Sequence, residues 1–361
     1  MFYLLLFYEF FAVLFSAFLA WHFPVSSTIS WILGILFLVA FNGLFVLMNL
    51  THSSFFLAKE TTVLCSFLLA TVSYLIIIFI INDFLLMIPQ YGKAFFTYRS
   101  YFIYTLSILA LFIGIYAVWN TQNIKIKHYH LSSDKNVSTR IAFLSDLHIA
   151  PHNMSVAKLR EIFSKLKKLT PDYVILGGDI IEMQPDYFME RPIIELFKDF
   201  NTQNTVLAVI GNHEYYGGQV HDNVSAMKDG GVIVLKDEVR LIPDKNIAFI
   251  GRDDKTNPHR LPLNRLTKDI PDTLYQVVLD HNPASIPDSI TEKADLQISG
   301  HTHNGQLFPF NFLVKYLYPN AYGHRKIKNT DTIVSSGIGT WGPLIRVGTQ
   351  NEVVMIDINK P

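Results

Sequence analysis

The charged residues of this 361-residue chain are distributed very unevenly, and that distribution constrains its fold more than any other feature. Residues up to Asn120 contain three of the 30 Lys and Arg residues and three of the 30 Asp and Glu residues, which leaves 27 of each sign (30 − 3) for the remainder. We therefore place a domain boundary near Asn120 and expect two domains, residues 1–120 and residues 121–361.

Four stretches of the first domain are long and apolar enough to cross a bilayer, which takes roughly 20 residues. Tyr and Trp residues gather near several of their ends, as they do at the headgroup level of membranes. The sequence therefore predicts an α-helical membrane domain with four transmembrane helices. These stretches are Met1–Trp21 (which includes Glu9), Trp31–Leu50, Thr61–Ile81 and Tyr101–Trp119.

An even number of spans places both ends of the membrane domain on the same side of the bilayer. Three lysines lie on that side, against Lys93 and Arg99 on the other, so the positive-inside rule favours a cytoplasmic second domain by one residue. The first stretch lacks the basic start and small-residue cleavage site of a signal peptide. We expect an integral membrane protein whose partner is the lipid bilayer.

The overall composition excludes several other classes of protein. Thirty basic and 30 acidic residues give zero net charge, so nucleic acid is not an expected partner. The 50% hydrophobic content excludes a disordered chain. Cys65 is the single cysteine, so the chain has neither an internal disulfide nor a thiolate metal site.

The second domain alternates strand-like and helix-like runs, which predicts an α/β fold with layered sheets flanked by helices. The predicted helices are Ser155–Leu169 and Pro192–Phe200. The predicted strands are Ile124–Leu131, Arg140–Ser145, Tyr173–Leu176, Val206–Ile210, Ile247–Ile250, Tyr275–Leu279, Asp295–Ser299, Thr332–Ser335 and Val353–Ile358.

Five of these strands run directly into short polar groups. Because ligands bind beyond the carboxyl ends of strands in α/β sheets, the five groups could converge on one place. Each group alone is more often an ordinary turn, but five in order at strand ends indicate a functional site. The groups are Ser145–His148, Gly177–Asp179, Gly211–Glu214, Leu279–His281 and Ser299–His303.

The residue types in these groups suit a pair of divalent metal ions. A mixed set of Asp, His and Asn ligands fits Mn, Fe or Zn, and we favour Mn. Asp146 and His148 are two residues apart, so their side chains point the same way in extended chain, and His301 and His303 repeat this spacing. Two such ions can clamp the attacking and leaving oxygens of a displacement at phosphorus.

The ordered set D-x-H, G-D, G-N-H-E, H and G-H-x-H resembles the calcineurin-like metallophosphoesterase superfamily over about Arg140–Ile358. The resemblance implies a phosphoesterase in which Asp179 bridges both metals and His213 protonates the leaving oxygen or stabilises the phosphoryl charge. It implies one metal bound by Asp146, His148 and His303, and another bound by Asn212, His281 and His301.

Two positions depart from the family pattern. Glu182 stands where many relatives have an Asp that orients the catalytic histidine, which puts that orienting role in doubt. Asn304 replaces a more usual Gly, but Asn tolerates positive φ, so the turn is expected to persist. Glu182, Asn304, Glu214 and Arg346 are candidates for supporting the ligands or touching substrate.

Ser299–Gln306 and Gly337–Arg346 resemble more narrowly a bacterial, membrane-associated branch that includes UDP-2,3-diacylglucosamine pyrophosphatases and lipid-linked phosphodiesterases. This implies a bacterial inner-membrane protein. Because four spans would keep an intact metal site close to the bilayer, where amphiphilic substrates are concentrated, we expect it to hydrolyse a phosphodiester or pyrophosphate bond in a lipid-linked substrate. Two alternatives stay open: a tethered phosphodiesterase for soluble nucleotides, and a non-catalytic signalling protein that binds metal or nucleotide. Asp253 and Asp254 follow a strand and could line the site, but a solvated turn is the favoured interpretation.

Overall fold

A computed structural model describes residues 57–151 and 153–360, which form two compact units. The first unit ends at Trp119 and includes Pro343–Ile345 from the other end of the chain; the second begins at Asn120. Each unit is described by itself below.

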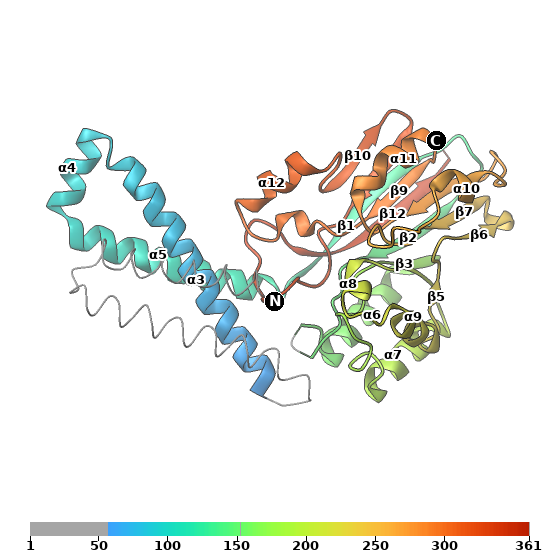
Figure 1. Ribbon diagram of the computed structural model, residues 1–361, viewed down its shortest axis with the longest axis horizontal. Coiled ribbons are helices and arrows are strands. Elements are labelled where there is room, and N and C mark those ends of the chain that lie inside the picture. Colours follow the sequence, from blue (N-terminus) through green and yellow to red (C-terminus); the bar gives the residue numbers. More distant parts are fainter. Residues whose placement is uncertain (1–56, 152, 361) are drawn as a thin grey trace. The chain divides into compact units, whose positions relative to one another are not determined.

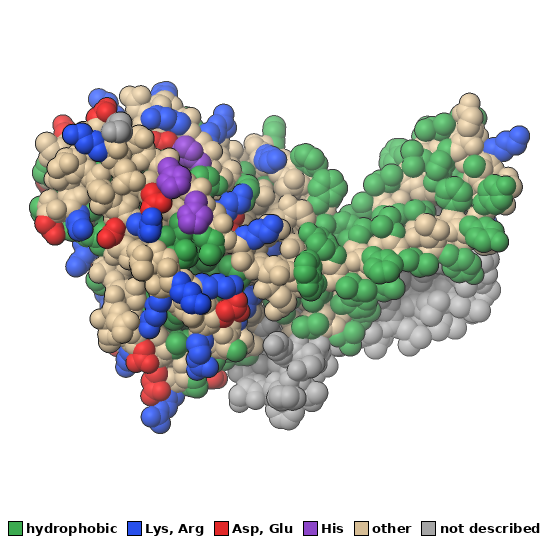
Figure 2. All heavy atoms as spheres, turned by 180° about the vertical axis from the view of Figure 1, so that it is seen from behind, with side chains coloured by type: hydrophobic (Ala, Val, Ile, Leu, Met, Phe, Trp, Pro, Cys, Tyr) green, Lys and Arg blue, Asp and Glu red, His purple; other side chains and the backbone are tan. Residues whose placement is uncertain are grey.

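The described part of the first unit is helical. It consists of α3 (Leu57–Leu85), α4 (Pro89–Thr97) and α5 (Arg99–Asn120). Two segments, Thr62–Leu85 and Arg99–Asn120, are long and apolar enough to cross a membrane, with mean hydropathies of 2.7 and 2.1. Hydrophobic side chains cover much of the described surface of this unit (Figure 2).

These two helices correspond to two of the four predicted spans, Thr61–Ile81 and Tyr101–Trp119. The other two, Met1–Trp21 with Glu9 and Trp31–Leu50, lie outside the described residues. The count of four transmembrane helices therefore stays a prediction.

The second unit is built on two six-stranded mixed sheets (Figure 1). The first sheet has the order β1-β12-β2-β3-β4-β5, in which β2 to β5 run parallel and β12 runs antiparallel to β2. Its strands are β1 (Ile124–Ser132), β2 (Thr139–Leu144), β3 (Tyr173–Gly177), β4 (Thr205–Val209), β5 (Ile233–Val234) and β12 (Asn351–Asn359).

The second sheet has the order β10-β11-β9-β8-β7-β6. Its four inner strands are parallel to one another, and each edge strand is antiparallel to its neighbour. The strands are β6 (Glu238–Ile242), β7 (Ile247–Gly251), β8 (Tyr275–Leu279), β9 (Leu296–Ser299), β10 (Gly323–Ile327) and β11 (Thr330–Val334).

An apolar core joins the two sheets, because fully buried side chains from both belong to one cluster, such as Phe143 of β2 and Phe249 of β7. A second cluster packs α6, α7 and α9 against the first sheet, and a third packs α10 against the second. The helices are α6 (Val156–Leu169), α7 (Arg191–Asn201), α8 (Asn212–Tyr216), α9 (Val220–Asp229), α10 (Leu263–Thr267), α11 (Ile286–Thr291) and α12 (Phe310–Leu317).

The spacing of apolar residues in α6 explains why this segment forms a helix that packs on the sheet. Leu159, Ile162, Phe163 and Leu166 are buried on one face, and the Ser155 hydroxyl accepts a hydrogen bond from the N–H of Lys158 at the start of the helix. The α/β fold of layered sheets is confirmed. The sequence did not predict the short elements β5, β6, β10 and α8 to α12.

Candidate metal centre

Each predicted ligand follows the carboxyl end of a parallel strand. In the first sheet, Asp146, Asp179 and Asn212 lie two or three residues beyond the ends of β2, β3 and β4. In the second sheet, His281 follows β8 and His301 follows β9. Parallel strands present these ends at a common edge, so ligands far apart in sequence come together.

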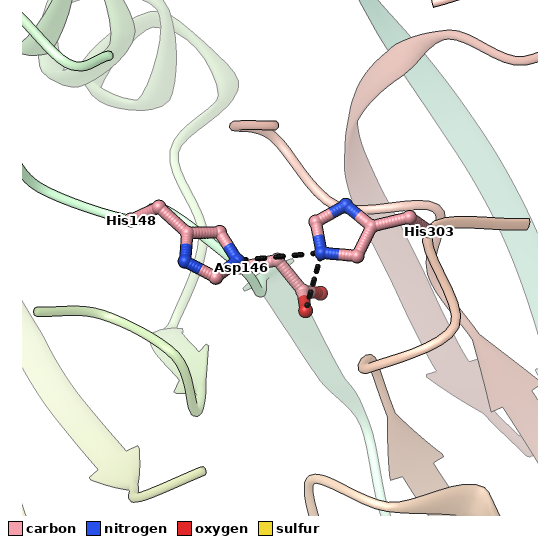
Figure 3. A group of neighbouring side chains, drawn as sticks. All are labelled: Asp146, His148 and His303. Carbon is pink, nitrogen blue, oxygen red and sulfur yellow. Dashed lines mark hydrogen bonds and ion pairs between the residues drawn. The ribbon is translucent and has the colours of Figure 1, made fainter. Parts of the chain in front are cut away.

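The first group of candidate ligands consists of Asp146, His148 and His303, whose ligand atoms all lie within 4.8 Å of one another. Nε2 of His303 is 3.3 Å from Oδ1 of Asp146 and 3.3 Å from Nε2 of His148. Asp146 and His148 come from the loop after β2 and His303 from the loop after β9, and the three side chains point toward one another (Figure 3). All three are buried.

The second group consists of Asp179, His281 and His301, which satisfy the same distance criterion. Oδ2 of Asp179 lies 3.2 Å from Nε2 of His281 and 3.9 Å from Nε2 of His148. A single carboxylate oxygen thus faces a histidine of each group, which is the position a bridging ligand needs.

Asn212 adds an oxygen that fits a metal ligand. Its Oδ1 is buried and has no hydrogen-bond partner among the described residues. An unpaired buried carbonyl oxygen is costly unless something binds it. Together with the Asp and His side chains it forms the mixed donor set expected for a divalent cation.

The histidine rings are oriented by partners on their other nitrogen. Nδ1 of His281 lies 2.8 Å from the carbonyl oxygen of Gly177, and Nδ1 of His148 lies 2.6 Å from Oε2 of Glu182. If each Nδ1 carries the proton for these bonds, Nε2 is left with its lone pair for a metal. This arrangement further supports metal binding.

Burial and neighbouring charges shift the pKa values of these histidines. Burial by itself would lower the pKa of His148, but its hydrogen bond to Glu182 and the charges of Glu182, Asp179 and Asp146 outweigh burial and raise the pKa to about 9. Burial also opposes charge on His281, yet Asp179 raises the pKa of that ring well above its usual value. The cluster therefore favours positive charge, which a divalent cation supplies.

His213, the predicted proton donor, lies beside the first group. Its Nδ1 is 2.9 Å from Oε1 of Glu182, and the other oxygen of Glu182 contacts His148. The longer Glu side chain does reach His213, and its carboxylate contacts His213 and a candidate ligand at once. His213 also belongs to a third close group, with His148 and Asp179.

Glu214 supports the backbone instead of facing the site. Its buried carboxylate accepts hydrogen bonds from the N–H groups of Asp179, Ile180, Ile181 and Gly211 at 2.6 to 3.1 Å. The loops that follow β3 and β4 are thereby tied together. Burial, followed by the charge of Asp179, raises the pKa of Glu214 to about 6.

Arg346 is completely buried, so it is not a surface cation. Its guanidinium donates to the carbonyl oxygens of Ser336 and Gly339 at 2.6 and 2.7 Å and lies 3.2 Å from Nδ1 of His303. It therefore holds the loop that carries His303. Asn304 adopts φ 50°, as expected for an Asn that replaces Gly in this turn.

The solvated turn predicted at Asp253 and Asp254 is wrong, because both side chains are buried. Tyr215 donates its hydroxyl to both carboxylate oxygens of Asp253, at 2.7 and 2.8 Å. Asp254 has a buried Oδ2 without a hydrogen-bond partner among the described residues, and its charge acts on His281. Both residues follow β7 just as His281 follows β8.

Comparison with known proteins identifies the domain. The calcineurin-like phosphoesterase family profile matches residues 139–305, a span that contains every candidate ligand. The chain thus carries a calcineurin-like metallophosphoesterase domain, whose clustered Asp and His side chains are able to bind metal.

Three curated relatives are similar to this chain in sequence. It is 28% identical to the uncharacterized metallophosphoesterase Cj0846 of Campylobacter jejuni, over 70% of this chain and 67% of the relative. It is 26% identical to an uncharacterized metallophosphoesterase of Aquifex aeolicus, over 69% of this chain and 97% of the relative. A zebrafish (Danio rerio) transmembrane protein with metallophosphoesterase domain is 27% identical, over 60% of this chain and 52% of the relative.

Proposed function

We propose that this protein is a membrane-anchored phosphoesterase with two divalent metal ions that hydrolyses a phosphodiester or pyrophosphate bond in a lipid-linked substrate. The observation that carries the proposal is the position of Asp179. Its Oδ2 lies between His281 at 3.2 Å and His148 at 3.9 Å, and these rings belong to two separate groups of ligands.

The two groups would divide the metals between them. Two bound cations, with Mn²⁺ as our first choice, would lower the pKa of a shared water and neutralise charge on the phosphate oxygens. Asp179 would hold both cations. Asp146, His148 and His303 would hold one, and Asn212, His281 and His301 the other.

Proton transfer to the leaving group falls to His213. The contact of its Nδ1 with Glu182 fixes the ring and leaves Nε2 free to carry a proton to the leaving oxygen. As the water oxygen bonds to phosphorus, the bond from phosphorus to the leaving oxygen breaks. That oxygen takes the proton from His213, and the attacking water gives a proton to solvent.

The lipid-linked substrate is inferred from the first unit. Two helices of the described chain are long and apolar enough to span a bilayer, and curated relatives are named as transmembrane proteins. Anchoring would confine the site near the membrane, where amphiphilic substrates are concentrated. We propose a bacterial inner-membrane location with the metal centre on the cytoplasmic side.

The test uses the purified full chain with Mn²⁺. Wild type and Asp179→Asn are compared for bound metal and for hydrolysis of a UDP-diacylglucosamine-type substrate, of soluble nucleotides and of bis(p-nitrophenyl) phosphate. We expect Asp179→Asn to lose metal and activity together, because the bridging charge is removed. Asp199→Asn, an exposed change on α7, is the matched control.

Two outcomes would contradict parts of the proposal. Retention of activity by an Asp179→Asn variant that binds no metal would exclude the two-metal mechanism. Faster turnover of soluble nucleotides than of the lipid-linked substrate would remove the lipid assignment and favour a tethered nucleotide phosphodiesterase.

A further inference from the structure

A continuous run of exposed hydrophobic side chains follows the metal centre in the sequence. It begins two residues before α12 and continues through that helix, none of whose residues is buried within the described molecule. We call this set the α12 apolar surface. Its members are Phe308, Phe310, Phe312, Leu313, Tyr316 and Leu317, with exposed fractions of 45, 55, 61, 52, 88 and 58%.

Exposure of this kind is unusual on a folded domain. Scattered apolar residues are normal on protein surfaces, but a contiguous group marks a place where another apolar body docks. The core of the second unit elsewhere buries its Phe side chains almost completely, as at Phe143, Phe188 and Phe249. The α12 apolar surface therefore requires an explanation outside the core of the domain.

The surface is joined directly to the metal centre. The turn His303–Gly305 carries a candidate ligand and leads within a few residues to Phe308. The N–H of Phe308 donates to the carbonyl oxygen of Val347 at 2.8 Å, next to Arg346, whose guanidinium contacts His303. The α12 apolar surface is thus tied to the loop that carries His303 in two ways. The chain runs directly from one to the other, and the hydrogen bond from Phe308 to Val347 holds the start of the surface next to Arg346.

The same segment is fixed to the residue at which α5 ends. Nδ2 of Asn120 donates to the carbonyl oxygens of Arg346 and Thr349, at 3.1 and 2.8 Å. Asn120 closes a 22-residue helix that is apolar enough to cross a bilayer. If α5 spans the membrane, Asn120 lies at the membrane–water boundary. The segment bonded to Asn120 includes Val347, whose carbonyl oxygen accepts the hydrogen bond from Phe308 at the start of the α12 apolar surface.

The composition of the surface suits a lipid interface. Aromatic side chains dominate it, and aromatic rings are favoured at the boundary between headgroups and acyl chains. Lys315 lies in the last turn of α12, with its Nζ 6.0 Å from the centre of the Phe312 ring. A short helix with apolar residues and a lysine is typical of a segment that lies in the plane of the membrane.

We propose that the α12 apolar surface inserts into the interface of the bilayer that anchors this chain. Bound in this way, it would hold the mouth of the metal centre at the level of the lipid headgroups. Lipid-linked phosphoesters would reach the metals without leaving the membrane. This inference rests on the proposed function, because it requires both a membrane anchor and an amphiphilic substrate.

The kinetic test compares two substrates in the same preparation. Full-length wild type and Phe312→Glu are reconstituted in phosphatidylethanolamine–phosphatidylglycerol vesicles with Mn²⁺. The measured quantity is the ratio of the hydrolysis rate of a lipid-linked phosphoester to that of bis(p-nitrophenyl) phosphate. We expect Phe312→Glu to lower this ratio about tenfold or more, since a large aromatic contact with lipid is lost.

Leu241→Glu is the matched control, because Leu241 is also apolar and 45% exposed but lies on the edge strand β6. Its ratio should equal that of wild type. An unchanged ratio in Phe312→Glu would overturn the membrane-contact proposal. Continued metal-dependent hydrolysis of the soluble ester would show that the metal mechanism survives that failure.

A second measurement detects lipid contact without using activity. In a Cys65→Ser background, an environment-sensitive fluorophore is attached through Phe312→Cys or, as the control, Leu241→Cys, in nanodiscs that hold one copy of the chain. Brominated lipids should quench the fluorophore at position 312 and not that at position 241. Equal quenching at both positions would contradict the proposal. Shielding of position 312 that appears only in nanodiscs with two copies of the chain would also contradict it, because the surface would then bind a second copy.

Discussion

Five of the candidate metal ligands adopt backbone conformations that most residues avoid. Asp146, His148, Asp179, His301 and His303 all have positive φ, between 46° and 70°. Each such residue costs on the order of 1 kcal/mol, and such strain persists only where the surrounding structure enforces it. Here the ends of the strands enforce these conformations. As a result, the side chains of these residues converge on one small volume.

Glu182 offers the sharpest test at the scale of a single residue. Its two carboxylate oxygens lie 2.6 Å from Nδ1 of His148 and 2.9 Å from Nδ1 of His213. In Glu182→Gln one oxygen becomes an NH₂ group, which cannot accept a hydrogen bond from the ring N–H that it faces. We expect kcat to fall about 10- to 100-fold, with a smaller change in KM, as is typical when a partner of a metal-bound histidine is removed.

Glu182→Asp keeps the charge and should restore part of the lost activity, whereas Glu190→Gln, an exposed change, should have no effect. Bound metal measured alongside kcat separates loss of the metal near His148 from misorientation of His213. A Glu182→Gln enzyme with wild-type kcat would exclude the positioning role.

Close packing of loops is the feature that matters at the scale of secondary-structure elements. The loop after β9 passes so near the loop after β2 that a Cβ added to Gly300 would lie 2.5 Å from Oδ2 of Asp146 and 2.6 Å from Cβ of Ser145. The absence of a side chain at Gly300 therefore lets the two sheets bring their ligands together.

Gly300→Ala should consequently displace Asp146. We expect affinity at the first metal position to fall about tenfold or more, since small shifts of ligands and their supports have effects of this size. Metal titration followed by elemental analysis measures it. Lys198→Ala, an exposed change on α7, is the control. Equal metal binding by the two variants would show that this close approach is unimportant.

Sequence patterns predicted the strands and the polar groups that follow them, because apolar runs ending in Asp, His or Asn can be recognised locally. The double contact of Glu182 was not predictable, since it joins residues 34 and 31 positions apart. The burial of Asp253 was missed for the same reason, because its partner Tyr215 lies 38 residues away. Nor does any local pattern show that the apolar residues of α12 stay exposed.

At the scale of the whole molecule, charge is segregated between the two units. Acidic and basic residues are rare before Asn120, while the second unit concentrates buried Asp, Glu and His side chains at one edge of its sheets. Such an assembly of buried carboxylates is stable only with compensating positive charge. In the metal-free protein the raised pKa values of His148 and His281 favour their charged forms, and a bound divalent cation would take over that role.

This exchange of protons for metal predicts a pH dependence. His148, with its pKa raised to about 9, is charged in the metal-free protein at neutral pH and must lose its proton to bind metal. The Kd for Mn²⁺ should therefore fall as pH rises from 6.5 to 8.5, by up to about tenfold per pH unit for each proton released. Calorimetric titration in buffers of different ionisation enthalpy counts those protons.

The stability of the folded protein should depend on pH for the same reason. Because the folded-state pKa of His148 is raised, its contribution to the free energy of unfolding of the metal-free protein is fully present below about pH 6.5 and is lost as pH rises through about 9. Metal binding, in contrast, strengthens over that range and stabilises the folded state by mass action. The difference in Tm between Mn²⁺-loaded and chelator-treated protein should therefore widen from pH 6.5 to 8.5. A constant difference, together with a Kd that does not vary with pH, would mean that the histidines are neutral before metal binds and that the buried carboxylates are balanced by another charge.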